Sequence, residues 1–130
     1  MQVDLPGEDG GQGLRVLIAD DHELFRAAAR RVLLASGFDV VPDAVDGAGA
    51  VRLVAELQPD VVLLDVQLPD GDGFQVAREL VRGPRPPVVV LVSSRSRSDY
   101  GGLVERSGVR GFIDKADLSG ARLLQELAGG

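Results

Sequence analysis

The sequence predicts an α/β domain with a doubly wound, five-stranded parallel sheet. Short apolar runs alternate with segments whose apolar residues recur every three or four positions, the pattern of alternating strands and helices. The run at residues 61–65 is apolar up to its terminal acid, which is typical of a strand covered on both faces. The chain has 130 residues, enough for one domain with its own core.

Two strands are expected before that run. Residues 14–19 form the first, and the helix after it repeats apolar residues at i, i+3, i+4, i+7 and i+8 from Phe25 and ends at Gly37. The second strand, residues 38–44, contains Pro42. Because proline cannot donate to a ladder, this strand should lie at an edge of the sheet.

The middle of the chain continues the alternation. Residues 50–55 mark a second helix, which Pro59 stops. After the 61–65 strand, the segment VQLPDGDG is rich in turn residues and predicts a loop. The third helix then runs from Phe74 to Val81.

The last third of the chain supplies two more strands, residues 88–92 and 111–114. The helix between them contains Gly101 and Gly102, and each glycine costs about 1 kcal/mol in a helix interior relative to alanine. We therefore expect this helix to be short or mobile. Ser119 is a suitable N-cap for the final helix.

These units fit the flavodoxin-like strand order 2-1-3-4-5, which keeps the proline-containing strand at an edge. In such sheets, ligands bind at the carboxyl ends of the strands near the switch between strands one and three. Residues 1–13 are glycine-rich and acidic, so we expect a disordered leader there. Residues 14–128 then form the single domain.

The composition excludes several classes of protein. The net charge of −6 makes the chain a poor partner for nucleic acid, because like charges repel. The chain has no cysteine, which excludes disulfides and thiolate chemistry and suits a cytosolic protein. Its start lacks the features of a signal peptide, and no apolar run is long enough to cross a membrane.

Charged side chains follow three of the predicted strands. Asp20 and Asp21 follow the first strand, Asp65 ends the third, and Lys115, the one lysine beside thirteen arginines, follows the fifth. Because the carboxyl ends of parallel strands lie along one edge, these groups should converge. Carboxylates are preferred ligands of Mg²⁺, and a carboxylate can also attack phosphorus. The cluster therefore predicts a site for a divalent cation and an anion.

Simpler interpretations exist for each residue. Asp20 or Asp21 could cap the next helix, and Asp65 could be an ordinary acid in a turn. Ser93, at the end of the fourth strand, offers a hydroxyl at the same edge but is by itself typical of a turn. We expect His22 to be a histidine at a helix start beside acids rather than a catalytic group.

The segments LIADDHELFR, VVLLDVQLPDGDGF, VVLVSS and GVRGFIDKADL resemble, in order and spacing, the receiver domain of two-component response regulators. The resemblance implies that Asp65 accepts a phosphoryl group from a histidine kinase. It also implies that Asp20 and Asp21 form an acid pocket. In that pocket Asp21, Asp65 and the backbone carbonyl of Gln67 bind Mg²⁺.

The resemblance assigns two further roles, a switch hydroxyl to Ser93 and a switch aromatic to Phe112. Lys115 takes the place of the lysine that contacts the phosphoryl group. The segments DDHELFR and GFIDKADL are similar to receivers of LuxR/NarL-type transcription regulators. Such a domain catalyses only its own phosphorylation and dephosphorylation. It is cytoplasmic, and its expected dimer face is formed by the fourth helix, the fifth strand and the fifth helix.

Some residues depart from the common pattern. Ala116 follows the lysine where many receivers have proline, and Phe112 lacks a hydroxyl. Tyr100, in the fourth helical segment with its two glycines, is expected at the surface or at a partner contact. Two alternatives stay open, an interaction module that is never phosphorylated and a small phosphohydrolase that forms an aspartyl phosphate. The second usually needs an acid at the position of Gln67.

Overall fold

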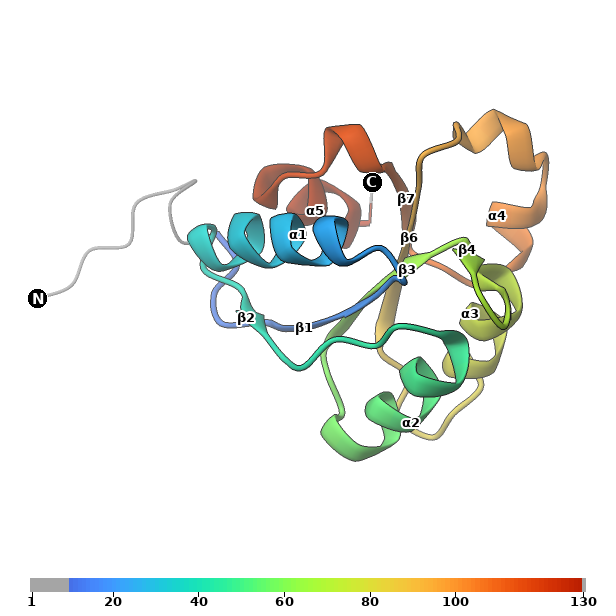
Figure 1. The fold of residues 1–130 in the computed structure, drawn as a ribbon, viewed down its shortest axis with the longest axis horizontal. Helices are drawn as coiled ribbons and strands as arrows, with labels where there is room; N and C mark the ends of the chain where they lie inside the picture. The colour runs from blue at the N-terminus through green and yellow to red at the C-terminus, as the bar shows by residue number, and fades with distance from the viewer. Residues whose placement is uncertain (1–9, 130) are drawn as a thin grey trace, which may run out of the picture.

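The computed structural model describes residues 10–129, in which a five-stranded parallel sheet carries helices on both faces (Figure 1). The strands of this sheet are β1 (Arg15–Ala19), β2 (Asp39–Val40), β3 (Val61–Asp65), β6 (Val88–Ser93) and β7 (Gly111–Asp114). Their order is β2-β1-β3-β6-β7, which confirms the predicted order 2-1-3-4-5. β1 and β3 are neighbours, so the two strands that end in acids lie side by side.

The helices form two layers that cover the sheet. They are α1 (Glu23–Ala35), α2 (Gly47–Leu57), α3 (Gly73–Val81), the short α4 (Leu103–Arg106) and α5 (Gly120–Leu127). Helices α1 and α5 share one apolar cluster with the sheet, and α2, α3 and α4 share the other. Within the described residues, none of these helices is long and apolar enough to cross a membrane.

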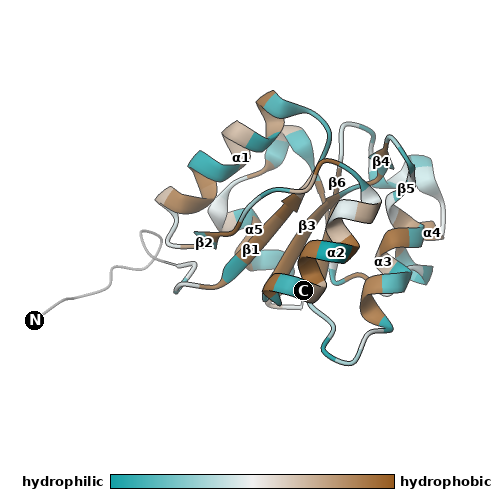
Figure 2. Cartoon of the chain, turned by 60° about the horizontal axis from the view of Figure 1, so that its bottom comes forward, coloured by the Kyte–Doolittle hydropathy of each residue, from teal (hydrophilic) through white to brown (hydrophobic). Residues whose placement is uncertain are grey.

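Side chains of the central strands alternate between the two clusters, as the two-residue period of a strand requires. In β3, for example, Val62 and Leu64 join the cluster of α2 and α3, whereas Val61 and Leu63 join that of α1 and α5. Figure 2 shows these apolar strands in brown between helices that carry both brown and teal. The sheet is therefore buried on both faces, as the continuous apolar run predicted.

The second strand is much shorter than predicted, and Pro42 explains the difference. Only Asp39–Val40 belongs to the ladder with β1, and an isolated bridge joins Ala19 to Ala44. The amides of Val41 and Ala44 donate to β1, but Pro42 between them has no N–H to donate. The predicted place of this strand, at the edge of the sheet, is confirmed.

Two other segments differ from the expectation. The turn-rich loop after β3 contains a small antiparallel hairpin, β4 (Gln67–Leu68) with β5 (Gly71–Asp72). Residues 10–13, inside the predicted disordered leader, form a turn in which Gly11 N donates to Ser36 O at 2.7 Å. The rest of that leader, residues 1–9, lies outside the described residues.

The fourth helical segment is short, as its glycines predicted. It consists of a 3₁₀ turn, η1 (Arg97–Tyr100), and the four-residue helix α4. Gly101 separates them with a φ of 59°, a left-handed conformation that favours glycine. This segment therefore has little regular structure of its own to stabilise it.

Candidate functional site

Three charged side chains meet at the carboxyl end of the sheet. Asp20 directly follows β1, Asp65 ends β3, and Lys115 directly follows β7. Both carboxylates are buried, and Lys115 Nζ lies 2.7 Å from Asp20 Oδ2 and 3.3 Å from Asp65 Oδ2. The ammonium also lies 4.6 Å from the centre of the Phe25 ring. The structure thus brings together residues that are far apart in the sequence.

Asp21 and His22 complete the acidic side of this cluster at the start of α1. The side chain of Asp21 is partly exposed, and its Oδ1 lies 3.3 Å from His22 Nδ1. The same ring nitrogen lies 2.9 Å from Asp20 Oδ1, which also accepts a hydrogen bond from the backbone N–H of His22. His22 is therefore a histidine at a helix start beside acids, as expected from the sequence.

The environment of Asp65 disfavours its charged form. Burial raises the pKa of the Asp65 carboxyl, and the negative charge of Asp20 raises it further. The hydrogen bond from Gln67 N and the ammonium of Lys115 act in the opposite direction and lower this pKa. One ammonium thus balances two buried carboxylates only in part, and a bound cation would relieve the repulsion that is left.

The donor set fits a hard divalent cation. Asp20, Asp21, His22 and Asp65 each offer one ligand atom, and these atoms lie within 4.8 Å of one another. Asp20 Oδ2 is buried, and the ammonium of Lys115 lies 2.7 Å from it. Three of the four groups are carboxylates, the ligand type that Mg²⁺ prefers.

The loop between β1 and α1 is fixed by an arginine that sequence reasoning did not single out. Arg26 Nη1 donates to Asp20 O at 2.9 Å, and Arg26 Nε lies 3.3 Å from Asp43 Oδ2. Arg26 thereby ties the carbonyl of the buried acid to the segment after β2. In the sequence, Arg26 is marked only by its position shortly after Asp20 and Asp21. Many surface arginines lie near acids in the same way, so this position did not indicate its role.

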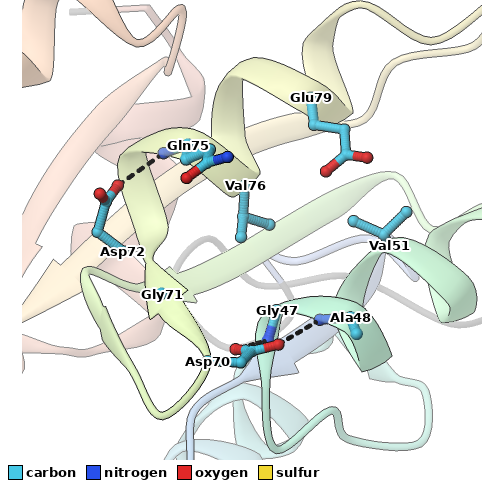
Figure 3. A pocket seen from close by; sticks show the side chains of 9 residues that line it. All are labelled: Gly47, Ala48, Val51, Asp70, Gly71, Asp72, Gln75, Val76 and Glu79. Carbon is cyan, nitrogen blue, oxygen red and sulfur yellow. Dashed lines mark hydrogen bonds between the residues drawn. The ribbon is translucent and has the colours of Figure 1, made fainter.

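The hairpin that carries Gln67 is tied to helix α2. Asp70 accepts hydrogen bonds from Gly47 N at 2.8 Å and Ala48 N at 3.0 Å, so its carboxylate closes the N-terminus of α2 (Figure 3). These two bonds hold the pKa of the Asp70 carboxyl below its ordinary value. The contact spans more than twenty residues and leaves no periodic signal, so the sequence did not reveal it.

The two predicted switch residues lie on neighbouring strands. Ser93 ends β6 and is 1% exposed, and Phe112 on β7 is buried. Tyr100 lies between these positions, with its hydroxyl 2.6 Å from Ser93 Oγ and its ring centre 5.9 Å from that of Phe112. Tyr100 is partly exposed, and its hydroxyl reaches the buried end of β6, a contact that the sequence did not indicate.

Comparison with known proteins decides the family. A family model described as the response regulator receiver domain matches residues 16–128. The chain belongs to this family. The resemblance drawn from the sequence motifs is thereby confirmed, and the chain is a receiver domain of the kind found in two-component systems.

Individual relatives agree with this assignment. Transcriptional regulatory protein DegU of Brevibacillus brevis is 34% identical over 103 residues, which are 78% of this chain and 44% of DegU. The solved signal receiver domain of the response regulator NarL from Mycobacterium tuberculosis is 34% identical, with a TM-score of 0.79 over 90% of this chain and 94% of that one. The similarity to NarL-type receivers therefore extends to the structure.

Similar sequences also occur in longer proteins that are named as enzymes. Protein-glutamate methylesterase/protein-glutamine glutaminase 5 of Myxococcus xanthus is 38% identical over 118 residues, which are 89% of this chain and 34% of that protein. The receiver spans about half the length of the first curated relatives it matches. The similarity therefore concerns the receiver part of these proteins.

Proposed function

We propose that this receiver domain accepts a phosphoryl group from the phosphohistidine of a histidine kinase on Asp65 and thereby switches a partner or dimer surface. The observation that carries the proposal is the buried Asp65 carboxylate 3.3 Å from Lys115 Nζ and beside a second buried carboxylate, Asp20. Burying two carboxylates and an ammonium carries a desolvation penalty, which is typical of charges that are kept for a function.

The transfer is a nucleophilic displacement at phosphorus. A carboxylate oxygen of Asp65 forms the new P–O bond while the P–N bond of the phosphohistidine breaks, and the imidazole nitrogen keeps the electron pair. The product is an acyl phosphate, whose phosphoryl group carries about −1.5 to −2 charges in place of the single negative charge of the Asp65 carboxylate. Lys115 balances part of this charge as a compact ammonium, and Ser93 can donate its hydroxyl to a phosphoryl oxygen.

Mg²⁺ is the proposed cofactor. Asp21, Asp65 and the backbone carbonyl of Gln67 would hold it, with Asp20 completing the acid pocket. When bound, the ion would neutralise charge on the transferring phosphoryl group. The hydrogen bonds from the N-terminus of α2 to Asp70 keep the hairpin of Gln67 in place and so support this part of the site.

The proposed setting follows the relatives. A cytoplasmic histidine kinase domain donates the phosphoryl group, and the output is control of transcription, the role that DegU carries in its name. The acidic net charge suits a domain that leaves DNA contact to another part of the protein. The proposed dimer face is formed by α4, β7 and α5.

The test is treatment with acetyl phosphate and Mg²⁺, followed by intact-protein mass spectrometry. The wild-type chain should gain one phosphoryl group, and Asp65→Asn should gain none. Asp39→Asn removes an exposed carboxylate on the edge strand β2 and should label like the wild type. Labelling of Asp65→Asn at the wild-type level would refute the assignment of the phosphoacceptor.

Two further measurements separate the alternatives. Steady turnover of a phosphate ester would favour the phosphohydrolase, and a lack of any Mg²⁺-dependent rise in stability would favour an interaction module that is never phosphorylated. If Lys115 links phosphorylation to the output surface, Lys115→Ala should take up the phosphoryl group without any change in self-association. If phosphorylation changed the self-association of Lys115→Ala as much as that of the wild type, this role of Lys115 would be contradicted.

A further inference from the structure

Tyr100 occupies an unusual place for a residue of a surface segment. It is half-buried, and its hydroxyl lies 2.6 Å from Ser93 Oγ at the end of β6. Its ring centre lies 5.3 Å from that of Phe74 at the start of α3 and 5.9 Å from that of Phe112 on β7. Tyr100 therefore joins the candidate switch hydroxyl to an aromatic row that crosses to the β7 side.

The hydroxyl of Ser93 is already engaged in this structure. Its Oγ accepts a hydrogen bond from Arg95 N at 3.0 Å and shares a second one with Tyr100. Within residues 10–129, neither Asp65 nor Lys115 forms a hydrogen bond with it. Either oxygen can donate in the pair with Tyr100; when Ser93 is the donor, its one proton becomes available to a phosphoryl oxygen only after that bond breaks.

Phe112, by contrast, is held in place. It is 5% exposed and lacks a hydroxyl. Its backbone N–H donates to Glu126 Oε1 at 3.1 Å, and its carbonyl accepts from Arg122 Nη2 at 3.3 Å. Helix α5 thus fixes the backbone of this residue on both sides, which opposes movement of β7.

The segment that carries Tyr100 is restrained far less. It is the short turn η1, followed by Gly101 in a left-handed conformation and by Gly102. The ion pair that crosses it, between Arg97 and Glu105, is exposed, and such pairs contribute little to stability. Of these two aromatic residues, Tyr100 therefore lies on the segment whose backbone has fewer restraints.

We propose that Tyr100 is the positioning residue of Ser93 and the moving aromatic group of this receiver, the role that the resemblance to other receivers gives to Phe112. This inference rests on the proposed function. Before phosphorylation, the Tyr100 hydroxyl holds Ser93. When Ser93 donates to a phosphoryl oxygen on Asp65, its bond to Tyr100 breaks, and η1 is released to move about the glycines that follow it.

The chain offers a direct probe of this event. It contains one tyrosine and no tryptophan, so its intrinsic fluorescence reports on Tyr100 alone. Phosphorylation by acetyl phosphate and Mg²⁺, followed in parallel by mass spectrometry, should change the tyrosine emission of the full chain. Unphosphorylated Ser93→Ala should already show the emission of the phosphorylated wild type, because it lacks the same hydrogen bond.

A matched control is provided by the next residue. Ser94 is exposed, so Ser94→Ala should keep the emission and the phosphorylation response of the wild type. Tyr100→Phe keeps the ring and frees Ser93. Its phosphorylated fraction at a limiting acetyl phosphate concentration should rise by roughly two- to tenfold, the factor that one neutral hydrogen bond represents. A merely structural role of Tyr100 would leave that fraction unchanged or lower it.

The outcomes distinguish the two proposals. If the chain is phosphorylated on Asp65 and its tyrosine emission stays the same, the role of Tyr100 is overturned and the proposed function stands. If no phosphoryl group is taken up, both are overturned. An emission of unphosphorylated Ser93→Ala that equals that of the unphosphorylated wild type would also overturn the role of Tyr100.

Discussion

Replacing Gly73 with alanine should destabilise the chain and disturb the end of β3, which carries the proposed phosphoacceptor Asp65. Gly73 begins α3, and its N–H donates to Val66 O at 2.6 Å, directly beyond the end of β3. A Cβ at this position would lie 2.2 Å from Asp65 O and 2.9 Å from Val66 Cα. Both are backbone atoms, so no side-chain rotation can make room, and α3 must move away from Asp65.

The size of the effect follows from these contacts. Ordinary contacts of this kind lie near ~3.5 Å, so the gap must open by more than ~1 Å. Overpacking of this kind costs about 1–3 kcal/mol. A favourable helix propensity offsets up to about 1 kcal/mol of that cost, because alanine is a better helix former than glycine. We expect a net loss of about 1–2 kcal/mol, or a fall in Tm of roughly 4–8 °C.

Equilibrium unfolding in urea, with a matched glycine variant, checks this expectation. In Gly83→Ala the new Cβ would lie 3.5 Å from Leu80 O, an ordinary contact, so its midpoint should stay close to that of the wild type. Gly73→Ala should unfold at a lower urea concentration and take up the phosphoryl group more slowly, since Asp65 is displaced. Equal midpoints for the two variants would refute the steric argument.

Three other predictions concern carboxylates. Without divalent cations at neutral pH, Asp65→Asn should raise the urea midpoint, because it removes a buried charge whose pKa is raised by burial and then by Asp20. This gain should vanish below the ordinary pKa of aspartate, where the carboxyl is protonated in both states; a gain that persists there would contradict it. Asp46 caps α2 by accepting from Gly49 N at 2.7 Å, so Asp46→Ala should lose about 1 kcal/mol in thermal unfolding, and Asp46→Asn should lose less. The pKa of Asp70 is lowered by its two N–H donors, so its contribution is present above the ordinary aspartate range and is lost as the pH falls through the lowered value. Asp70→Asn should therefore lose less stability than the wild type as the pH falls. An equal loss in both proteins would contradict the role of the two hydrogen bonds to Asp70.

The fold and the acidic cluster could be predicted because their signals are local. The apolar run before Asp65 identified a central strand, and Pro42 identified an edge strand, so the sheet order followed with few alternatives. The convergence of Asp20, Asp65 and Lys115 then followed from the rule that parallel strands end at one edge. Each of these inferences needs only the residue types within one strand and its first loop residue.

The rest depends on contacts that have no periodic trace in the sequence. The glycines after Tyr100 interrupt any helical pattern, so nothing indicated which way its side chain would point. The phenol reaches Ser93 from the residue directly before the left-handed turn at Gly101. The clamp from Asp70 to α2 likewise joins segments that are separate in sequence and close only once α2 and α3 pack together.

The distribution of local stability indicates where the signal of the proposed phosphorylation would travel. Strands β3 and β6 are buried on both faces, and a packed core resists gradual deformation. Phe112 on β7 is tied to α5 through its N–H and its carbonyl. The segment η1 also contacts Ser93, through Tyr100; it has an exposed ion pair and two glycines after it and so should open at a low free-energy cost. A change of a few kcal/mol at Asp65 can therefore shift the population of the η1–α4 segment while the sheet stays unchanged.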